Sequence, residues 1–301
     1  MKKLLLTYLL ILITGFVANA QTDYYPLITG LSTSGNGRAP QGSQRYNRSI
    51  WLITAAEMTA SGFANGSIVS SLGFYYLTAQ NIPTTGNMTV YLQNTADATN
   101  TKSTTWATAI TGMTTASNSS VTIPAVTGNV DFVFAGGSTF TYTGGALYIA
   151  FDYQNIAGTL STSNVAACNT DLTGGLKGAI STTVNQTTVA ASNFRPETRL
   201  GKSVTCARPV NLNVVSSTLN SANLSWTSSA NVELEWGPYN FTQGSGTTIT
   251  NVSSPYTLSG LAPSSAYEYY VRTNCGGSFS VWAGPYAFHI IFEATSPTYN
   301  T

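Results

Sequence analysis

The chain has 301 residues, of which 43% are hydrophobic and only 8% are charged, whereas about 25% of residues are charged in an average soluble domain. So few lysines and glutamates exclude a helix bundle, because exposed helix faces are usually built from those residues. The apolar and aromatic content exceeds that of a disordered chain. The length predicts about two domains.

Residues 1–20 have the three parts of a secretory signal peptide. Lys2 and Lys3 form the positive region, residues 4–17 are apolar, and Ala18-Asn19-Ala20 resembles a cleavage site. The apolar run is too short for a membrane span of about 20 residues. We therefore expect export to the outside of the cell or to its surface, with no integral span in the mature chain.

Export also changes the charge of the protein. Without Lys2 and Lys3, ten of the 12 basic residues remain against 11 acidic ones, so the net charge is −1. This balance argues against nucleic acid as a partner, which requires a basic patch, and against an anionic membrane surface.

Short apolar segments separated by turn residues follow from residue 68 onward. Only residues 54–58 indicate a helical turn. We predict strands at 68–77, 88–93, 120–123, 130–134, 138–142 and 146–153. Many short strands predict a β-sandwich or jelly roll for residues 21–203.

A second set of strands follows a join at residues 201–205. We predict strands at 211–215, 221–227, 232–236, 247–252, 256–258, 267–273 and 285–288. About seven strands at this spacing are typical of an immunoglobulin-like sandwich, here at 204–289. Residues 290–301 form a tail.

The motifs of this second domain resemble those of a fibronectin type III domain from secreted Bacteroidota proteins. They comprise Pro209, Leu224-Ser225-Trp226, Glu235-Trp236-Gly237-Pro238, residues 258–263, Tyr267 and Tyr270-Val271-Arg272. The resemblance implies that Trp226 fills the centre between two sheets. It also implies that Leu261 and Tyr267 hold a corner, with the tyrosine hydroxyl bonded to nearby backbone.

The first domain is similar to a family of Bacteroidota surface modules. The similarity covers residues 46–51, Glu57, 68–76, 88–92, Trp106 and 140–150. Such modules commonly precede fibronectin type III repeats in adhesin-like or protease-associated exported proteins. Exported relatives usually continue into further repeats or a sorting domain, so we expect this chain to be part of a longer surface protein.

The resemblance also implies a disulfide between Cys206 and Cys275. Closing a loop of 69 residues contributes roughly 4 kcal/mol through chain entropy. Cys168 is then left over, either as a buried thiol, as an intermolecular bridge or as a nucleophile.

Candidate catalytic groups are few. His289 is the only histidine, and one histidine with three dispersed cysteines does not make a zinc site. Paired carboxylates would suffice for a glycosidase, and the candidates are Asp131, Asp152, Glu57, Glu233 and Glu235. We expect Glu233 and Glu235 to form a solvated stripe. No phosphate-binding loop is present, and we predict no catalytic residues, metal or cofactor.

The binding candidates are aromatic. Trp51, Tyr75 and Trp106 could stack on sugars, and the loop at 276–284 carries Phe279 and Trp282 at one end of the sandwich, where loops often bind partners. We therefore predict a non-catalytic extracellular recognition or adhesion protein that binds an unknown protein or glycan. The alternatives are a carbohydrate-binding accessory module and, remotely, a secreted hydrolase.

Overall fold

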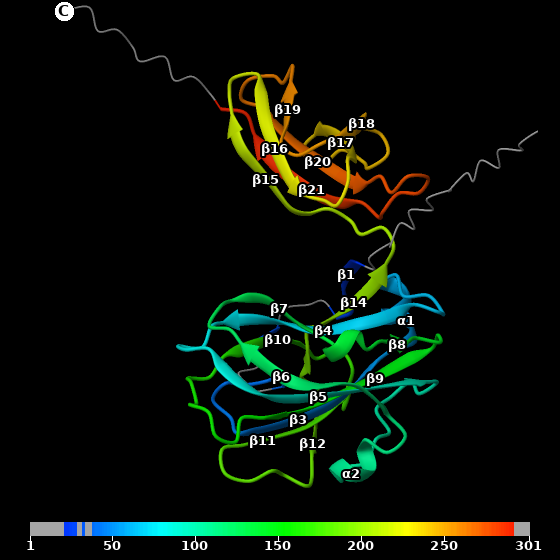
Figure 1. The fold of residues 1–301 in the computed structure, drawn as a ribbon, viewed down its shortest axis with the longest axis vertical. Coiled ribbons are helices and arrows are strands. Elements are labelled where there is room, and N and C mark those ends of the chain that lie inside the picture. The colour runs from blue at the N-terminus through cyan, green and yellow to red at the C-terminus, as the bar shows by residue number, and fades with distance from the viewer. Residues whose placement is uncertain (1–20, 29–31, 34–37, 292–301) are drawn as a thin grey trace, which may run out of the picture. The chain divides into compact units, whose positions relative to one another are not determined.

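The computed structural model describes residues 21–28, 32–33 and 38–291. The expected signal peptide and most of the expected tail lie outside these residues. The chain forms two compact units, one of which is Thr22–Val204, while the other begins at Thr205. Both consist mainly of β-strands, and the few short helices all lie in the first unit (Figure 1), so the all-β prediction is confirmed.

The first unit contains two sheets. The strands of its eight-stranded sheet are β1 (Gln21–Pro26), β2 (Ser32–Thr33), β4 (Ile68–Thr78), β7 (Gly128–Val133), β8 (Phe140–Thr141), β10 (Val165–Asn169), β13 (Arg195–Pro196) and β14 (Thr198–Val204). The six-stranded sheet has the order β12 (Ala190–Ser192), β11 (Leu176–Ser181), β3 (Tyr46–Ile53), β9 (Ala146–Gln154), β5 (Thr84–Thr95) and β6 (Thr114–Ile123).

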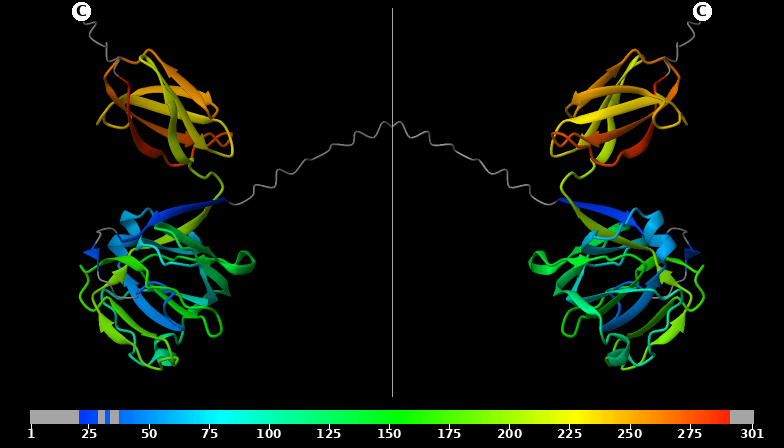
Figure 2. Two further views of the ribbon diagram at one scale, coloured as in Figure 1. Left: turned by 90° about the vertical axis from the view of Figure 1, so that its left-hand side faces the viewer. Right: turned by 90° about the vertical axis from the view of Figure 1, so that its right-hand side faces the viewer.

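The two sheets pack face to face as layers (Figures 1 and 2), so the β-sandwich prediction for this unit is confirmed. Alternate residues of β4, namely Leu72, Phe74 and Tyr76, meet Trp51 and Phe151 from the opposite sheet in one buried core. This arrangement follows from the two-residue period of a strand, which sends every second side chain to the same face.

The outer face of the six-stranded sheet is covered over its central strands β3 and β9. The helix α2 (Trp106–Ala109) packs with Tyr148 and Ala150 of β9 in a separate apolar cluster. Every residue of β9 from Ala146 to Tyr153 is therefore buried. Apart from Asp152, which pairs with Arg48, the buried residues of this strand are apolar on both sides because both sides have a protein layer to contact.

One further helix, α1 (Ala55–Ala60), follows β3 at the position where the sequence indicated a helical turn. Its start is a capping box, in which the Thr54 hydroxyl accepts from the Glu57 amide while the Glu57 carboxylate accepts from the Thr54 amide. Arg195, only 1% exposed, donates to both oxygens of Glu57 at 2.9 and 2.7 Å. The helix is thus joined to the strand β13.

The second unit is a smaller sandwich of two sheets. One sheet has the order β15 (Val210–Ser217), β16 (Ser221–Thr227) and β19 (Tyr256–Ser259); the other has β18 (Thr247–Val252), β17 (Val232–Pro238), β20 (Ala266–Thr273) and β21 (Ala283–His289). Each of the seven predicted strands corresponds to one of these seven elements. Trp226 and Leu261 lie in the core between the sheets, and Tyr267 packs against it.

The Tyr267 hydroxyl accepts a hydrogen bond from the Ala262 amide at 2.9 Å, which is the geometry of a tyrosine corner. This contact ties the segment before β20 to the strand itself.

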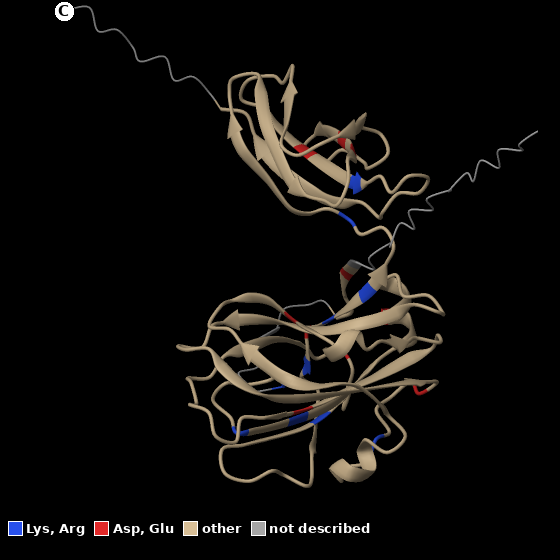
Figure 3. Cartoon of the chain, in the orientation of Figure 1, with Lys and Arg blue, Asp and Glu red and all other residues tan. Residues whose placement is uncertain are grey.

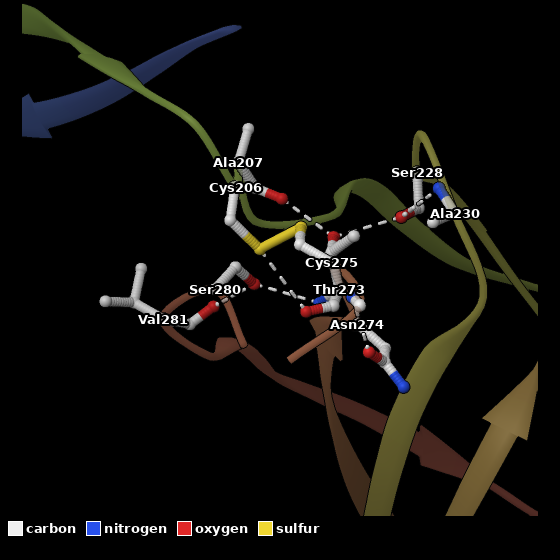
Figure 4. The surroundings of a disulfide bond; sticks show 10 residues. Cys206, Ala207, Ser228, Ala230, Thr273, Asn274, Cys275, Ser280 and Val281 are labelled. Atoms are coloured by element: carbon white, nitrogen blue, oxygen red, sulfur yellow. Dashed lines mark hydrogen bonds between the residues drawn. A yellow bond between two sulfur atoms is a disulfide. The ribbon is translucent and has the colours of Figure 1, made fainter. Parts of the chain in front are cut away.

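The disulfide Cys206–Cys275 lies at the end of β20 (Figure 4), with a Cα–Cα distance of 5.9 Å. Beside it, Thr273 donates through its hydroxyl to the Ala207 carbonyl and through its amide to the Ser280 hydroxyl. Cys168 is the remaining cysteine, and its side chain is fully buried in the first unit. Its burial agrees with the interpretation as a buried thiol. No helix among the described residues has the length and apolarity that a membrane crossing requires.

Candidate recognition surfaces

The five aromatic candidates occupy very different environments. Trp51 is fully buried, with its ring centroid 6.0 Å from that of Phe74. Trp106 is 4% exposed and lies beneath the guanidinium of Arg48, 5.3 Å from its ring centroid. The prediction that these two tryptophans contact a ligand is therefore wrong, because both sides of the six-stranded sheet are covered and each ring is part of a core.

Tyr75 is partly exposed on the outer face of β4, because Phe74 and Tyr76 point inward. It borders a pocket of about 200 Å3. The other lining residues are Pro26 of β1, Asn129 of β7, Arg199 of β14, and Glu197, which lies between β13 and β14. Tyr75 and Asn129 are direct cross-strand partners.

Gly73 lies two residues before Tyr75 on β4, next to this pocket. Gly73 pairs with Arg199 on one side and with Asp131 on the other. A Cβ on Gly73 would lie 2.0 Å from an Asp131 oxygen and 2.8 Å from Arg199 Cγ. Because Gly73 has no Cβ, the Arg199 Nε can approach Asp131 to 2.9 Å across β4. The same guanidinium lies 4.5 Å from the Tyr24 ring centroid.

Glu197, unlike Asp131, forms no ion pair with an arginine or lysine among the described residues. Its Oε2 atom is buried and accepts no hydrogen bond from the described residues. Burial accordingly raises the pKa of this carboxyl, since the charged form loses water without gaining a donor.

The second unit carries a cluster that we call the arginine clamp, made of Glu233, Arg272, Phe279 and Trp282. The Arg272 guanidinium carbon lies 4.3 Å from the Phe279 ring centroid and 4.5 Å from that of Trp282. Its Nε and Nη2 atoms donate to Glu233 Oε1 at 3.0 and 2.6 Å. The clamp therefore holds two aromatic side chains of the 274–283 loop against β17 and β20.

The turn of this loop is also fixed at its base. The Cys275 amide donates to the Ser278 carbonyl at 2.9 Å, and the enclosed Gly276 and Gly277 have φ angles of 71° and 123°. Only glycine adopts such angles readily. Phe279 remains 44% exposed and Val281 50% exposed, so the loop presents apolar side chains to solvent from a rigid frame.

The aromatic surface continues along the outer face of the same sheet. Tyr270 is two residues before Arg272 on β20 and meets Phe241 edge to face at 5.6 Å. Glu235 is 2% exposed and accepts from the Gly244 and Gly246 amides at 2.7 and 2.8 Å. The expectation of a solvated Glu233 and Glu235 stripe is wrong, because both carboxylates organise this face.

The carboxylates considered for catalysis are engaged in structural contacts. Asp152 pairs with Arg48 at 2.8 Å, and Glu57, Asp131 and Glu233 pair with other arginines. His289 is exposed at the end of β21. Charged residues are sparse over both units (Figure 3), and the described residues contain no group of three His, Cys, Asp or Glu side chains placed to hold a metal.

The strand order and core of the second unit agree with the domain family that its sequence matches. Residues 207–288 match the Fibronectin type III domain family. The C-terminal unit contains a fibronectin type III domain. The arginine clamp and the 274–283 loop belong to this domain.

Solved structures that resemble the chain include three that each cover less than a third of it. One is a computer-redesigned β-sandwich protein, with 25% identity, a TM-score of 0.24 and coverage of 27% of this chain and 92% of that chain. Another is described as a myokine structure, with 19% identity, a TM-score of 0.25 and coverage of 28% and 97%.

A third is the fibronectin type III domain of the human collagen alpha-1(XX) chain, with 22% identity, a TM-score of 0.25 and coverage of 30% and 89%. No curated protein matches the chain significantly.

Proposed function

We propose that this is a non-catalytic, exported recognition protein that binds an extracellular protein partner through its fibronectin type III domain. The contact surface is the 274–283 loop, with Phe279 and Val281 as the exposed apolar contacts. Trp282 of the same loop and Arg272 of β20 support them. The signal-like segment at residues 1–20 and the disulfide suit an oxidising extracellular setting.

The observation that carries the proposal is the arginine clamp. Trp, Tyr and Arg dominate the binding energy of protein interfaces, and a surface that is already ordered loses less entropy on binding. Here a guanidinium is held between two rings and by a carboxylate, and the disulfide and the glycine turn fix the base of the loop. Phe279 is thus presented in one conformation.

The carbohydrate-binding alternative rested on Trp51, Tyr75 and Trp106 in the first unit. Trp51 and Trp106 are both buried, so of these three rings only Tyr75 is partly exposed. Glycans therefore enter the test below as competing ligands.

The proposal is tested by measuring binding of the purified protein to a panel of extracellular proteins and polysaccharides by surface plasmon resonance. We expect saturable binding to a protein member. Phe279→Ala should weaken this binding by about tenfold or more, the loss typical of an interface hot spot. The fold of each variant is checked by circular dichroism.

Val215→Ala is the matched control, because Val215 is 60% exposed on β15, which belongs to the other sheet. This variant should bind as the wild type does. Equal binding by the folded Phe279→Ala variant, binding to polysaccharides alone, or turnover of a panel member would contradict the proposal.

A further inference from the structure

The pocket beside Tyr75 lies in the first unit and takes no part in the recognition surface proposed above. Its walls come from separated segments of the chain, namely β1, β4, β7 and the segment leading into β14. At about 200 Å3 it is smaller than the roughly 300–1,000 Å3 of pockets for drug-sized ligands. It therefore suits a single small group, such as one side chain.

The charges around the pocket do not balance. Arg199 is paired with Asp131 at 2.9 Å and lies over the ring of Tyr24, so these two charges offset each other. Glu197 contributes a second carboxylate, and no described cation forms an ion pair with it. Together, Arg199, Glu197 and Asp131, the last of which lies behind Arg199 and outside the lining, carry an excess of one negative charge.

Glu197 also lacks a hydrogen-bond donor. Its buried Oε2 atom accepts nothing from the described residues, and a buried acceptor without a partner costs free energy. An occupant that brings both a positive charge and N–H donors would offset both deficits. A neutral sugar would supply donors without the charge.

The apolar part of the lining fits the rest of such an occupant. Tyr75 offers a ring to which a cation is attracted, and Pro26 offers an apolar wall against which methylene groups can pack. Asn129, the cross-strand partner of Tyr75, adds an amide oxygen that can accept from an N–H.

We propose that this pocket binds a primary ammonium group on an aliphatic chain, with the ammonium at Glu197 and the methylene groups between Pro26 and Tyr75. The shared chemistry is that of a lysine side chain on a partner protein and of a free diamine. The site does not depend on the fibronectin type III domain, so it can be tested separately from the proposed function.

The test is a titration of the 15N-labelled protein followed by NMR, with the side-chain amide of Asn129 as the reporter. The probes are Nα-acetyl-lysine methylamide and 1,4-diaminobutane, which separate peptide-bound lysine from free amine. Nα-acetyl-norleucine methylamide is the neutral control, because it keeps the aliphatic chain and lacks the ammonium. We expect saturable shifts with an ammonium probe and none with norleucine.

Glu197→Gln preserves the size of the side chain and removes its charge, and it should weaken the binding of the ammonium probe by about tenfold or more. Asp171→Asn, at an exposed carboxylate of the first unit that does not line the pocket, should leave it unchanged. The dispersed spectrum of each variant verifies folding.

The proposal is overturned if norleucine shifts Asn129 as strongly as lysine does, or if folded Glu197→Gln binds the ammonium probe as the wild type does. It is equally overturned if neither ammonium probe shifts Asn129 at its solubility limit, or if a methyl hexopyranoside does so in their place.

Discussion

Two carboxyl groups of the first unit illustrate how neighbouring donors decide the ionisation of a buried side chain. Burial by itself would raise the pKa of Glu57, but hydrogen bonds from Arg195 and Thr54, together with the arginine charge, outweigh it and hold the pKa below its ordinary value. Glu197 is half-buried, its Oε2 atom has no such donor, and its pKa is raised by burial. The same residue type therefore stabilises the fold at one position and strains it at the other.

Opposite pH dependences follow for these two residues. The contribution of Glu57 is complete above its ordinary pKa of 4.5 and is lost as the pH falls through the depressed value. Glu57→Gln should lower the free energy of unfolding at neutral pH by about 3 kcal/mol, because it leaves Arg195 buried without its counter-charge. The variant should also be less sensitive than the wild type to acid below about pH 4.5.

Glu197 behaves in the reverse sense. Its contribution is present below the ordinary pKa of 4.5 and is lost as the pH rises through the raised value. Glu197→Gln should therefore raise the free energy of unfolding at pH 7. It should also abolish the decrease in this free energy that the wild type shows as the pH rises through the raised pKa. Urea unfolding across the pH range measures both variants, and parallel pH profiles for the two would contradict the assignment.

Individual side chains were predictable only in part from the sequence. Alternation in Phe74-Tyr75-Tyr76 indicated that Tyr75 faces away from its neighbours, and it does, but alternation could not say which face meets the core. Trp51 lies in the run Ile50-Trp51-Leu52-Ile53, which is apolar on both faces and carries no periodic signal. The pocket at Glu197 joins segments distant in sequence, so no local pattern indicated it.

At the level of whole strands, close contact between β5 and β9 depends on a residue without a side chain. A Cβ on Gly86 would lie 2.7 Å from the carbonyl oxygen of Gln154 and 2.7 Å from the ring of Tyr153. The backbone cannot give way without disturbing the register in which Asn87 faces Gln154.

Gly86→Ala should therefore destabilise the first unit by about 2 kcal/mol, a typical cost of overpacking. The measurement is the midpoint of urea unfolding at an unchanged slope. Thr85→Ala, at an exposed neighbouring position of the same strand, should change stability by about 0.5 kcal/mol or less. Equal midpoints for Gly86→Ala and Thr85→Ala would show that the strands can separate to accept the methyl group.

The strands predicted from the sequence are those with sustained apolar runs or alternation. All seven strands of the fibronectin type III domain and six of the first unit were predicted, with ends that differ by a few residues. The segment from β10 to β14 was missed because its strands contain small residues such as Ala167, Gly178 and Ala190 in place of large apolar ones. The helix α2 was missed because four residues carry no helical period.

At the scale of the molecule, each unit has its own buried core. The disulfide Cys206–Cys275 closes a loop of 69 residues within the second unit alone. Its effect on stability should therefore be confined to that unit.

Replacing both cysteines by alanine should cost the second unit roughly 4 kcal/mol, through the entropy gained by its unfolded chain. Differential scanning calorimetry of the full chain should show one transition moved to lower temperature and the other unchanged. The single substitution Cys168→Ala, in the first unit, identifies which transition belongs to which unit. A shift of both transitions in the double variant would refute independent cores.

The strand β9 is hydrogen-bonded on both edges, by β3 and by β5, and covered on both faces. Its amides are reached by solvent only when the whole unit opens, so in deuterium oxide they report global rather than local opening. In hydrogen–deuterium exchange measured by mass spectrometry, a peptide from residues 146–153 therefore serves as the reference for global unfolding of the first unit. Any segment of the first unit that exchanges faster than this peptide opens without unfolding that unit.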